Sequence, residues 1–233
     1  MAKTQKEEWK TYKNVFDNHS IQLLEKFRSQ GHYDEMQSPL AIGKEANVFT
    51  AKKGDGLVIV KIYRLENCNF NKMYSYLAPD PRFHGLKKKN RMIVFAWVQR
   101  EYRNLLKARE VIRVPKPIAV KDNIIIMEFI GHDDAAPKLK DSEPTDPEAF
   151  YKKVKKDMRA LYKDAGIVHA DLSEFNILNL EEAPVFIDFS QSTTQEHPNA
   201  EDFLIRDVHN IGNYFRKKGV KVDDEKLLAE IKK

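Results

Sequence analysis

Apolar residues follow two different periodicities along this chain, and the change between them divides it. Residues 41–130 contain short apolar runs rich in β-branched side chains, which predict strands, and one long helical pattern. From Gly131 onward the spacing is mainly helical, with short apolar runs in between. The sequence therefore predicts an α+β fold with a small β-rich N-lobe at residues 41–130 and a reduced, mainly helical C-lobe at residues 131–233. We expect the hinge at residues 127–134, where an apolar run gives way to glycine and charge.

A polar, helical extension is expected ahead of the N-lobe, at residues 1–40. Its apolar residues are spaced to form one face of a helix, and Gly31 follows as a stop signal. The residues of this face are Phe16, Leu23, Leu24 and Phe27. The extension is too short to form a domain of its own.

Residues 65–90 form the least regular stretch of the chain. Pro79, Pro81 and Gly85 stand among many polar residues, between a predicted strand and a predicted helix. Loops longer than about 12–15 residues are usually functional or disordered. We therefore expect a mobile loop that becomes ordered with nucleotide or a partner.

A helix with clear end signals precedes the polar motifs of the C-lobe. Asp146 is placed to cap it, Pro147 suits its first position and Gly166 ends it. Its inner stripe consists of Phe150, Val154, Met158 and Leu161.

Composition restricts the class of protein. The chain has 233 residues, a net charge of +5 and 42% hydrophobic residues, so it can bury a sizeable core. Its single cysteine, Cys68, excludes an internal disulfide framework and a cysteine-rich metal site. The sequence contains no long apolar run and no signal-peptide core, so we expect a cytoplasmic protein without a membrane partner. The basic charge favours polyanions such as nucleotide phosphates or RNA, although a solvated Lys/Glu-rich surface also explains it.

The motifs HADLSEFN (residues 169–176) and PVFIDFSQ (residues 184–191) carry the chemistry. Phosphoryl transfer requires one carboxylate at the attacking hydroxyl, and an amide and a second carboxylate to hold metal against ATP phosphates. Asp171 is our candidate for the first role. Asn176 and Asp188 are the candidate ligands of Mg²⁺. We expect His169 to be a structural hydrogen-bonding residue rather than a base.

Lys61 interrupts the apolar run LVIVKIY (residues 57–63). A buried lysine needs an anionic partner unless its side chain reaches water. Glu101 lies on the same helical stripe as Trp97 and Leu105, so it is the partner that we predict. Lys61 would then hold the phosphates of ATP.

Two further segments are candidates for binding ATP. IGKEANVF (residues 42–49) would be a turn covering the phosphates, although it has one glycine instead of the usual three. Backbone groups of residues 128–130 would meet the adenine edge, because a strand leaving a sheet has unpaired groups. The expected contacts are Ile42, Gly43, Lys44 and Val48 in the turn, and Met127, Glu128 and Ile130 near the base.

With these residues in place, the chain resembles the RIO family of atypical serine/threonine protein kinases, most of all its Rio1 branch of archaeal type. GKEANVF, VIVKIY, HADLSEFN and IDFSQS match that branch in order, over about residues 41–215. The resemblance implies a two-lobed protein-kinase-like fold and an autophosphorylating kinase or ATPase that uses ATP with Mg²⁺, or Mn²⁺ in its place. It also implies a role in maturation of the small ribosomal subunit. The partner would then be the precursor of that subunit, which consists of rRNA and ribosomal proteins.

The same resemblance implies two covalent sites. The family forms an aspartyl-phosphate at the metal-binding aspartate, which is Asp188 here. Its members autophosphorylate in the loop before the helix that carries the glutamate, Glu101 here. In this chain Ser75 is the only serine or threonine between Arg64 and Met92. The chain lacks the APE motif of ordinary protein kinases, which makes efficient phosphorylation of free peptides doubtful.

Two other functions are compatible with the residues. A small-molecule phosphotransferase of the aminoglycoside-kinase type has a similar order of motifs, but its acidic pocket needs a larger helical lobe. A non-catalytic ribosome-assembly module that binds ATP as a switch is disfavoured because the whole polar set is present. A screen of acceptor alcohols and an Asp171→Ala variant would distinguish them from the kinase.

Overall fold

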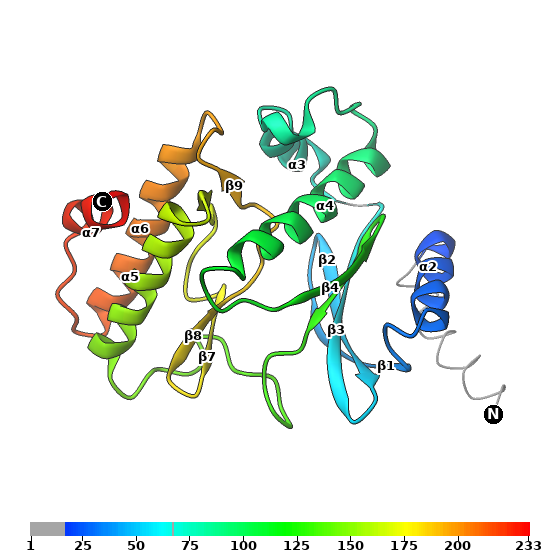
Figure 1. Ribbon diagram of the computed structural model, residues 1–233, viewed down its shortest axis with the longest axis horizontal. Coiled ribbons are helices and arrows are strands. Elements are labelled where there is room, and N and C mark those ends of the chain that lie inside the picture. The colour runs from blue at the N-terminus through cyan, green and yellow to red at the C-terminus, as the bar shows by residue number, and fades with distance from the viewer. Residues whose placement is uncertain (1–16, 67) are drawn as a thin grey trace.

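A five-stranded antiparallel sheet forms the N-lobe, in the order β1-β2-β3-β5-β4. The computed structural model describes residues 17–66 and 68–233. Figure 1 shows the sheet with α2 beside it and α4 running toward the helices of the C-lobe. The strands are β1 (Glu35–Ile42), β2 (Ala46–Lys53), β3 (Gly56–Tyr63), β4 (Pro117–Lys121) and β5 (Ile124–Glu128). The helices of this lobe are α2 (Asn18–Ser29), α3 (Phe70–Leu77) and α4 (Asn90–Ala108), with a 3₁₀ turn at Pro81–Phe83.

Strand β3 is apolar at almost every position because both faces of the sheet are covered. Val58 and Val60 belong to a buried cluster with residues of α2. Ile59 and Tyr63, which alternate with them, belong to the larger cluster that contains Trp97 of α4. Side chains alternate across a strand, so a helix on each face makes both sets apolar.

The N-terminal helix agrees with its prediction in part. Leu23, Leu24 and Phe27 are buried in α2, and Gly31 follows the helix with φ +75°. Phe16 lies outside the described residues. The sheet begins at Glu35, six positions before the start that we predicted, because β1 is an exposed edge strand whose residues show no apolar alternation.

Residues 65–90, which we expected to be a loop, contain regular structure. This segment contains α3 and the 3₁₀ turn, and Met73, Tyr76 and Leu77 are buried at helical spacing. Asn69 caps α3 by accepting a hydrogen bond from Lys72 N–H. The short helix was hidden in the sequence because polar residues and two prolines surround its three apolar anchors.

Three helices and two short ladders make up the C-lobe. This lobe lies at the left of Figure 1. The cap from Asp146 and the buried stripe of the first helix are confirmed. The loop between β6 and β7 carries Asp171, and the segment between β8 and β9 carries Asp188. The elements are α5 (Pro147–Lys163), β6 (Ile167–Val168), β7 (Ile177–Leu180), β8 (Ala183–Phe186), β9 (Thr193–Thr194), α6 (Ala200–Lys217) and α7 (Asp224–Lys232). Within residues 17–66 and 68–233, no helix has the length and apolar character needed to cross a membrane.

Candidate active site

A cleft of about 830 Å³ lies between the five-stranded sheet and the β7-β8 ladder of the C-lobe. All the residues predicted to bind ATP, bind metal or act in catalysis line it, and Ser75 is absent from its lining. The predicted residues in the lining are Ile42, Gly43, Lys44, Val48, Lys61, Glu101, Met127, Glu128, Ile130, Asp171, Asn176 and Asp188. Residues from both lobes therefore converge on one space.

Lys61 stands at the centre of the charged groups in the cleft. Its Nζ lies 2.7 Å from Glu101 Oε1, which confirms the predicted pair, and 3.0 Å from Asp188 Oδ1. Burial acts to lower the pKa of Lys61, but the two carboxylates outweigh it and hold the pKa well above its usual value. Tyr63 donates a second hydrogen bond to Glu101, at 2.6 Å, so the buried glutamate keeps a fixed orientation.

Asp188 follows β8 in a left-handed backbone conformation, with φ +61°. This region costs an L-residue about 1–2 kcal/mol, although Asp tolerates it better than most. Burial acts to raise the pKa of Asp188, but Lys61 and a hydrogen bond from Ser190 lower it to about 2. The side chain is 41% exposed and ionised, so it presents a negative oxygen to the cleft.

Asp171 is held by two amide side chains. Its Oδ2 accepts hydrogen bonds from Gln191 Nε2 at 3.0 Å and from Asn176 Nδ2 at 3.2 Å. Asn176 also donates to the Asp171 backbone carbonyl at 2.9 Å. Burial and the charge of Asp188 raise the pKa of Asp171 above its usual value. A carboxylate with a raised pKa is better suited to accept a proton from a hydroxyl.

Side chains of α6 anchor the loop that carries Asp171, residues 169–176. Asp207 is buried and accepts hydrogen bonds from Ala170 N–H at 2.7 Å and Leu172 N–H at 2.8 Å. Arg206 donates to the Ala170 carbonyl. Sequence reasoning missed both residues, and also Gln191, since nothing in a helix pattern indicates which loop its polar residues meet.

His169 has the structural position that we expected. It is 2% exposed, and its Nε2 lies 3.0 Å from the Ile187 carbonyl oxygen. Burial lowers the pKa of His169 to about 4, so the ring is neutral near pH 7. A neutral ring fixed to a backbone carbonyl links the loop that carries Asp171 to the residue before Asp188.

The turn at residues 42–46 joins β1 and β2 over the cleft. A Cβ on Gly43 would lie 2.8 Å from the Ala46 carbonyl oxygen, which explains the glycine. The Gly43 N–H already donates to that oxygen, at 3.0 Å, so this N–H group has a partner within the turn. The turn offers the cleft one cationic side chain, the exposed Lys44, and beside it the half-buried carboxylate of Glu45.

Two of the backbone groups that we predicted at the adenine edge already have partners in the protein. Glu128 N–H donates to Lys116 O at 2.8 Å, and the Glu128 carboxylate pairs with Arg113 at 2.7 Å. The N–H and the carboxylate of Glu128 are therefore engaged away from the cleft, because β5 continues to pair at this residue. Ile130 lies beyond the strand, and its carbonyl accepts from Ala136 N–H at 2.9 Å.

Asn176 and Asp188 are adjacent through the backbone, because Ile187 N–H donates to the Asn176 carbonyl at 3.0 Å. Carboxylate and amide oxygens are ligands that suit Mg²⁺, which usually takes one or two of them and completes its shell with phosphates and water. Among the described residues, no group of three or more His, Cys, Asp and Glu side chains is arranged to hold a metal. Asn176 and Asp188 supply one amide and one carboxylate oxygen, a pair that fits a metal whose other ligands are phosphates and water.

The two lobes, the cleft between them and the lysine–glutamate pair define a protein-kinase-like domain. A comparison with protein families matches the RIO domain over residues 47–227. The chain belongs to the RIO domain family.

Two curated relatives support the assignment to this family. A RIO-type serine/threonine-protein kinase Rio1 of Methanocaldococcus jannaschii is 44% identical, over 92% of this chain and 74% of the relative. A protein of the same name from Haloferax volcanii is 42% identical, over 95% of this chain and 77% of the relative.

Solved structures resemble the chain in fold. The Rio2 kinase of Chaetomium thermophilum, in a complex with ADP, Mg²⁺ and phosphoaspartate, has a TM-score of 0.67 and 24% identity. The match covers 89% of this chain and spans 64% of the Rio2 chain. A second structure of that kinase has a TM-score of 0.68. The protein-kinase-like fold is thus confirmed.

Proposed function

We propose that the chain is an Mg-ATP-dependent serine/threonine protein kinase that also hydrolyses ATP. The position of Lys61, 2.7 Å from Glu101 and 3.0 Å from Asp188, carries the proposal. A buried lysine fixed between these two carboxylates is the arrangement that protein kinases use to orient ATP phosphates. The names of the relatives in Methanocaldococcus jannaschii and Haloferax volcanii, both serine/threonine-protein kinases, support it.

The polar residues predicted for the cleft then bind the nucleotide, hold the metal or take part in the chemistry. Lys61 holds the α- and β-phosphates, and Asn176 and Asp188 hold Mg²⁺, or Mn²⁺ in its place. The metal supplies positive charge where the transferred phosphoryl group develops negative charge. Asp171 orients the attacking hydroxyl and accepts its proton. Ile42, Lys44, Val48, Met127 and Ile130 enclose the nucleotide.

Asp188 itself is the proposed first acceptor. One carboxylate oxygen attacks the γ-phosphorus, the bond to the β–γ bridging oxygen breaks, and ADP leaves. Water then attacks the acyl phosphate, which releases inorganic phosphate and restores the carboxylate. A pKa of about 2 keeps Asp188 ionised for this attack. The Rio2 structure with phosphoaspartate supports this step.

Incubation with γ-labelled ATP and Mg²⁺, without any substrate, tests the proposal. Free phosphate and label on the protein are followed in the wild type and in Asp188→Asn. We expect hydroxylamine-sensitive label that is lost in the variant. Label resistant to hydroxylamine would favour direct transfer to serine without an aspartyl-phosphate.

Two results would contradict the proposed function. Absence of turnover in the wild type, with ATP still bound, would favour a binding switch. Rapid transfer to small alcohols or sugars would favour a small-molecule phosphotransferase.

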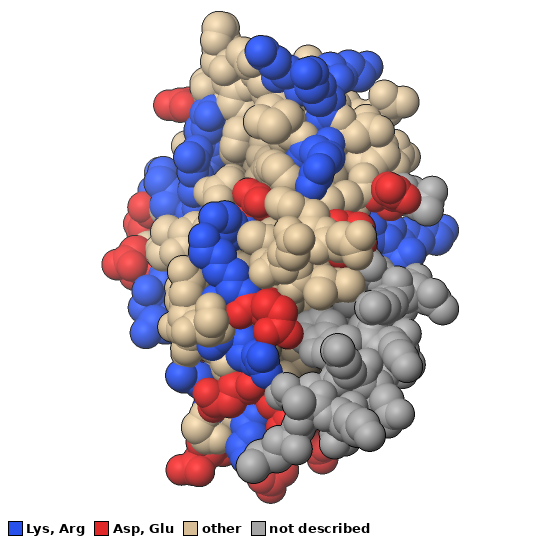
Figure 2. Space-filling view, turned by 90° about the vertical axis from the view of Figure 1, so that its right-hand side faces the viewer, with Lys and Arg blue, Asp and Glu red and all other residues tan. Residues whose placement is uncertain are grey.

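The proposed partner is the precursor of the small ribosomal subunit, on family resemblance, and the proposed location is the cytoplasm. Figure 2 shows Lys and Arg gathered at the top of the molecule, at the level of α3 and the start of α4. Lys87, Lys88, Lys89 and Arg91 are exposed in this part of the chain. Cationic side chains attract RNA phosphates in a salt-dependent manner. Reversal of these charges should weaken RNA binding and reduce its salt dependence.

A further inference from the structure

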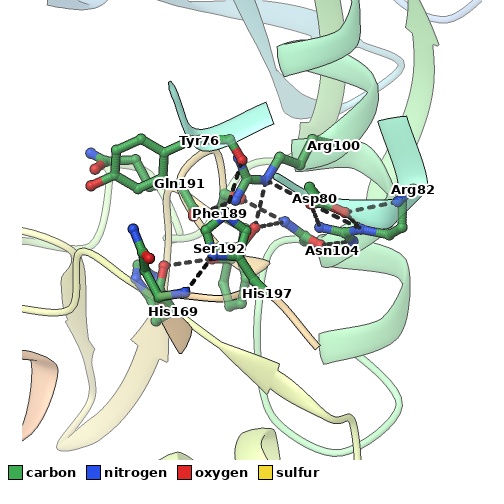
Figure 3. Close-up of polar contacts among 11 residues, drawn as sticks. Tyr76, Asp80, Arg82, Arg100, Asn104, His169, Phe189, Gln191, Ser192 and His197 are labelled. Atoms are coloured by element: carbon green, nitrogen blue, oxygen red, sulfur yellow. Dashed lines mark hydrogen bonds and ion pairs between the residues drawn. The ribbon is translucent and has the colours of Figure 1, made fainter. Parts of the chain in front are cut away.

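Polar side chains of the N-lobe converge on a turn of the C-lobe at residues 189–192 (Figure 3). Arg100 and Asn104 extend to it from α4, and both are fully buried. They lie on either side of Glu101 in the same helix, one residue before it and three after. The helix that positions Lys61 therefore also contacts the segment that follows Asp188.

The contacts are hydrogen bonds to backbone carbonyls. Arg100 donates to Ser192 O at 2.8 Å and to Gln191 O at 3.0 Å. Asn104 Nδ2 donates to Ser192 O at 2.7 Å and to Phe189 O at 3.0 Å. Three of the four carbonyls after Asp188 are thus fixed by two side chains.

The same turn holds the catalytic loop. The Gln191 side chain donates to Asp171 Oδ2 at 3.0 Å, and Ser192 Oγ donates to His169 O at 2.9 Å. Asp188, immediately before the turn, has its left-handed backbone at φ +61°. A backbone in such a conformation persists when its surroundings over-determine it.

We propose that Arg100 and Asn104 are positioning residues for phosphoryl transfer, because they fix the turn that orients Asp188 and brings Gln191 to Asp171. The proposal rests on the proposed function of the cleft. It assigns α4 two tasks: Glu101 orients the lysine, and its neighbours orient the metal ligand and the proton acceptor.

Residues from the α3 side complete the network. Arg82 Nη1 donates to Asn104 Oδ1 at 2.7 Å, which leaves the Asn104 amide N–H groups directed at the turn. Asp80 is buried and lies 2.7 Å from Arg82 Nη2 and 3.6 Å from Arg100 Nε. Burial lowers the pKa of Arg100 to about 10, so its guanidinium remains charged at neutral pH. A residue that only filled space would not need a buried charge, which is costly.

Two variants separate positioning from packing. Arg100→Lys keeps the charge but loses the fork that reaches two carbonyls. Asn104→Leu keeps the size of the side chain and removes its donors. Lys107→Gln is the matched control, because Lys107 lies on α4 with an exposed side chain. Thermal unfolding and circular dichroism establish that each variant is folded.

Calorimetry then measures ADP binding with and without Mg²⁺, and single-turnover experiments measure phosphate release. We expect both variants to bind metal-free ADP within about twofold of the wild type, since Lys61 and the nucleotide pocket are unchanged. The gain in affinity from Mg²⁺ should fall about tenfold or more, and the rate of phosphate release should fall at least as much. Lys107→Gln should match the wild type in all three measurements.

Each outcome decides the matter. Loss of the Mg²⁺-dependent gain with intact metal-free binding supports positioning. Folded variants with wild-type Mg²⁺ dependence and rate, or with an equal loss of metal-free and Mg²⁺-dependent binding, would overturn it. A wild type that does not bind Mg-ADP would refute the proposed function itself, and this inference with it.

Discussion

Lys61 Nζ donates a hydrogen bond of 3.0 Å to Asp188 Oδ1, although 127 positions separate the two residues. β3 supplies the lysine and the segment after β8 supplies the aspartate. The contact therefore joins the two lobes across the cleft. It also brings a fixed positive and a fixed negative group to the place where nucleotide phosphates and metal are proposed to bind.

Replacement of Lys61 tests this centre. Lys61→Ala should lower ATP turnover about 100-fold or more, because one group that stabilises developing charge commonly contributes at least ~2.7 kcal/mol. Lys52→Ala removes an exposed lysine from the neighbouring strand and serves as the control. Phosphate release under single-turnover conditions measures both. Retained ATP turnover in Lys61→Ala would contradict the proposal that Lys61 holds the phosphates of ATP.

Asp171→Asn separates binding from chemistry. The amide keeps the size of the side chain but cannot accept the proton of a hydroxyl. We expect loss of transfer to serine by about 100-fold or more, with unchanged affinity for Mg-ADP. Glu174→Gln, in the same loop, should leave both quantities unchanged. A parallel loss of Mg-ADP affinity would show that Asp171 binds metal rather than orienting the hydroxyl.

Ser75 remains the proposed site of autophosphorylation. It is exposed on α3, and its Oγ donates to the Lys72 carbonyl at 2.8 Å. Because the residue is helical, we expect transfer to require local opening of α3. Mass spectrometry after incubation with Mg-ATP should find phosphate on Ser75 in the wild type and none in Asp171→Asn. Phosphate on other residues alone would refute the assignment.

Gly131 should be intolerant of any side chain. It has φ +148°, and an added Cβ would lie 2.1 Å from the Asp134 carbonyl oxygen. Gly131→Ala should therefore lower the free energy of unfolding by about 2–4 kcal/mol. Gly219 has φ +83° but open space around it, so Gly219→Ala should cost about 1 kcal/mol. Urea unfolding compares them, and equal losses would contradict the steric explanation.

Asp157 on α5 gives a pH-dependent prediction. Burial raises the pKa of Asp157 to about 6. The pKa of an aspartate in the unfolded chain is about 3.9, so the native state binds this proton more tightly. The stabilising contribution of Asp157 is therefore present below about pH 4 and is lost as pH rises through 6. Asp157→Asn does not titrate. It should be more stable than the wild type by about 1 kcal/mol near pH 7, and this advantage should vanish near pH 4.

Urea unfolding across that pH range measures the difference. Asp164→Asn is the control, because Asp164 is an exposed carboxylate that follows the same helix. A constant difference between Asp157→Asn and the wild type at all pH values would show that the aspartate is not perturbed by burial.

Local signals in the sequence determined much of the fold and of the site. The apolar run around Lys61 predicted a buried strand, and the stripe that includes Glu101 predicted its partner, because periodicity shows which residues face a core. Asp146 and Pro147 marked the start of α5 through cap chemistry that involves only neighbouring residues. The spacing of Asp171, Asn176 and Asp188 indicated the chemistry.

Contacts between distant segments were decided by the tertiary structure alone. The edge strand β1 has no apolar alternation, α3 is too short to show a long period, and Glu128 remained paired where the strand was expected to be free. Buried polar residues such as Arg100, Asn104 and Asp207 bond to backbone groups 35 to 92 positions away. Backbone carbonyls and N–H groups are the same in every residue, so only the folded chain determines which of them a polar side chain meets.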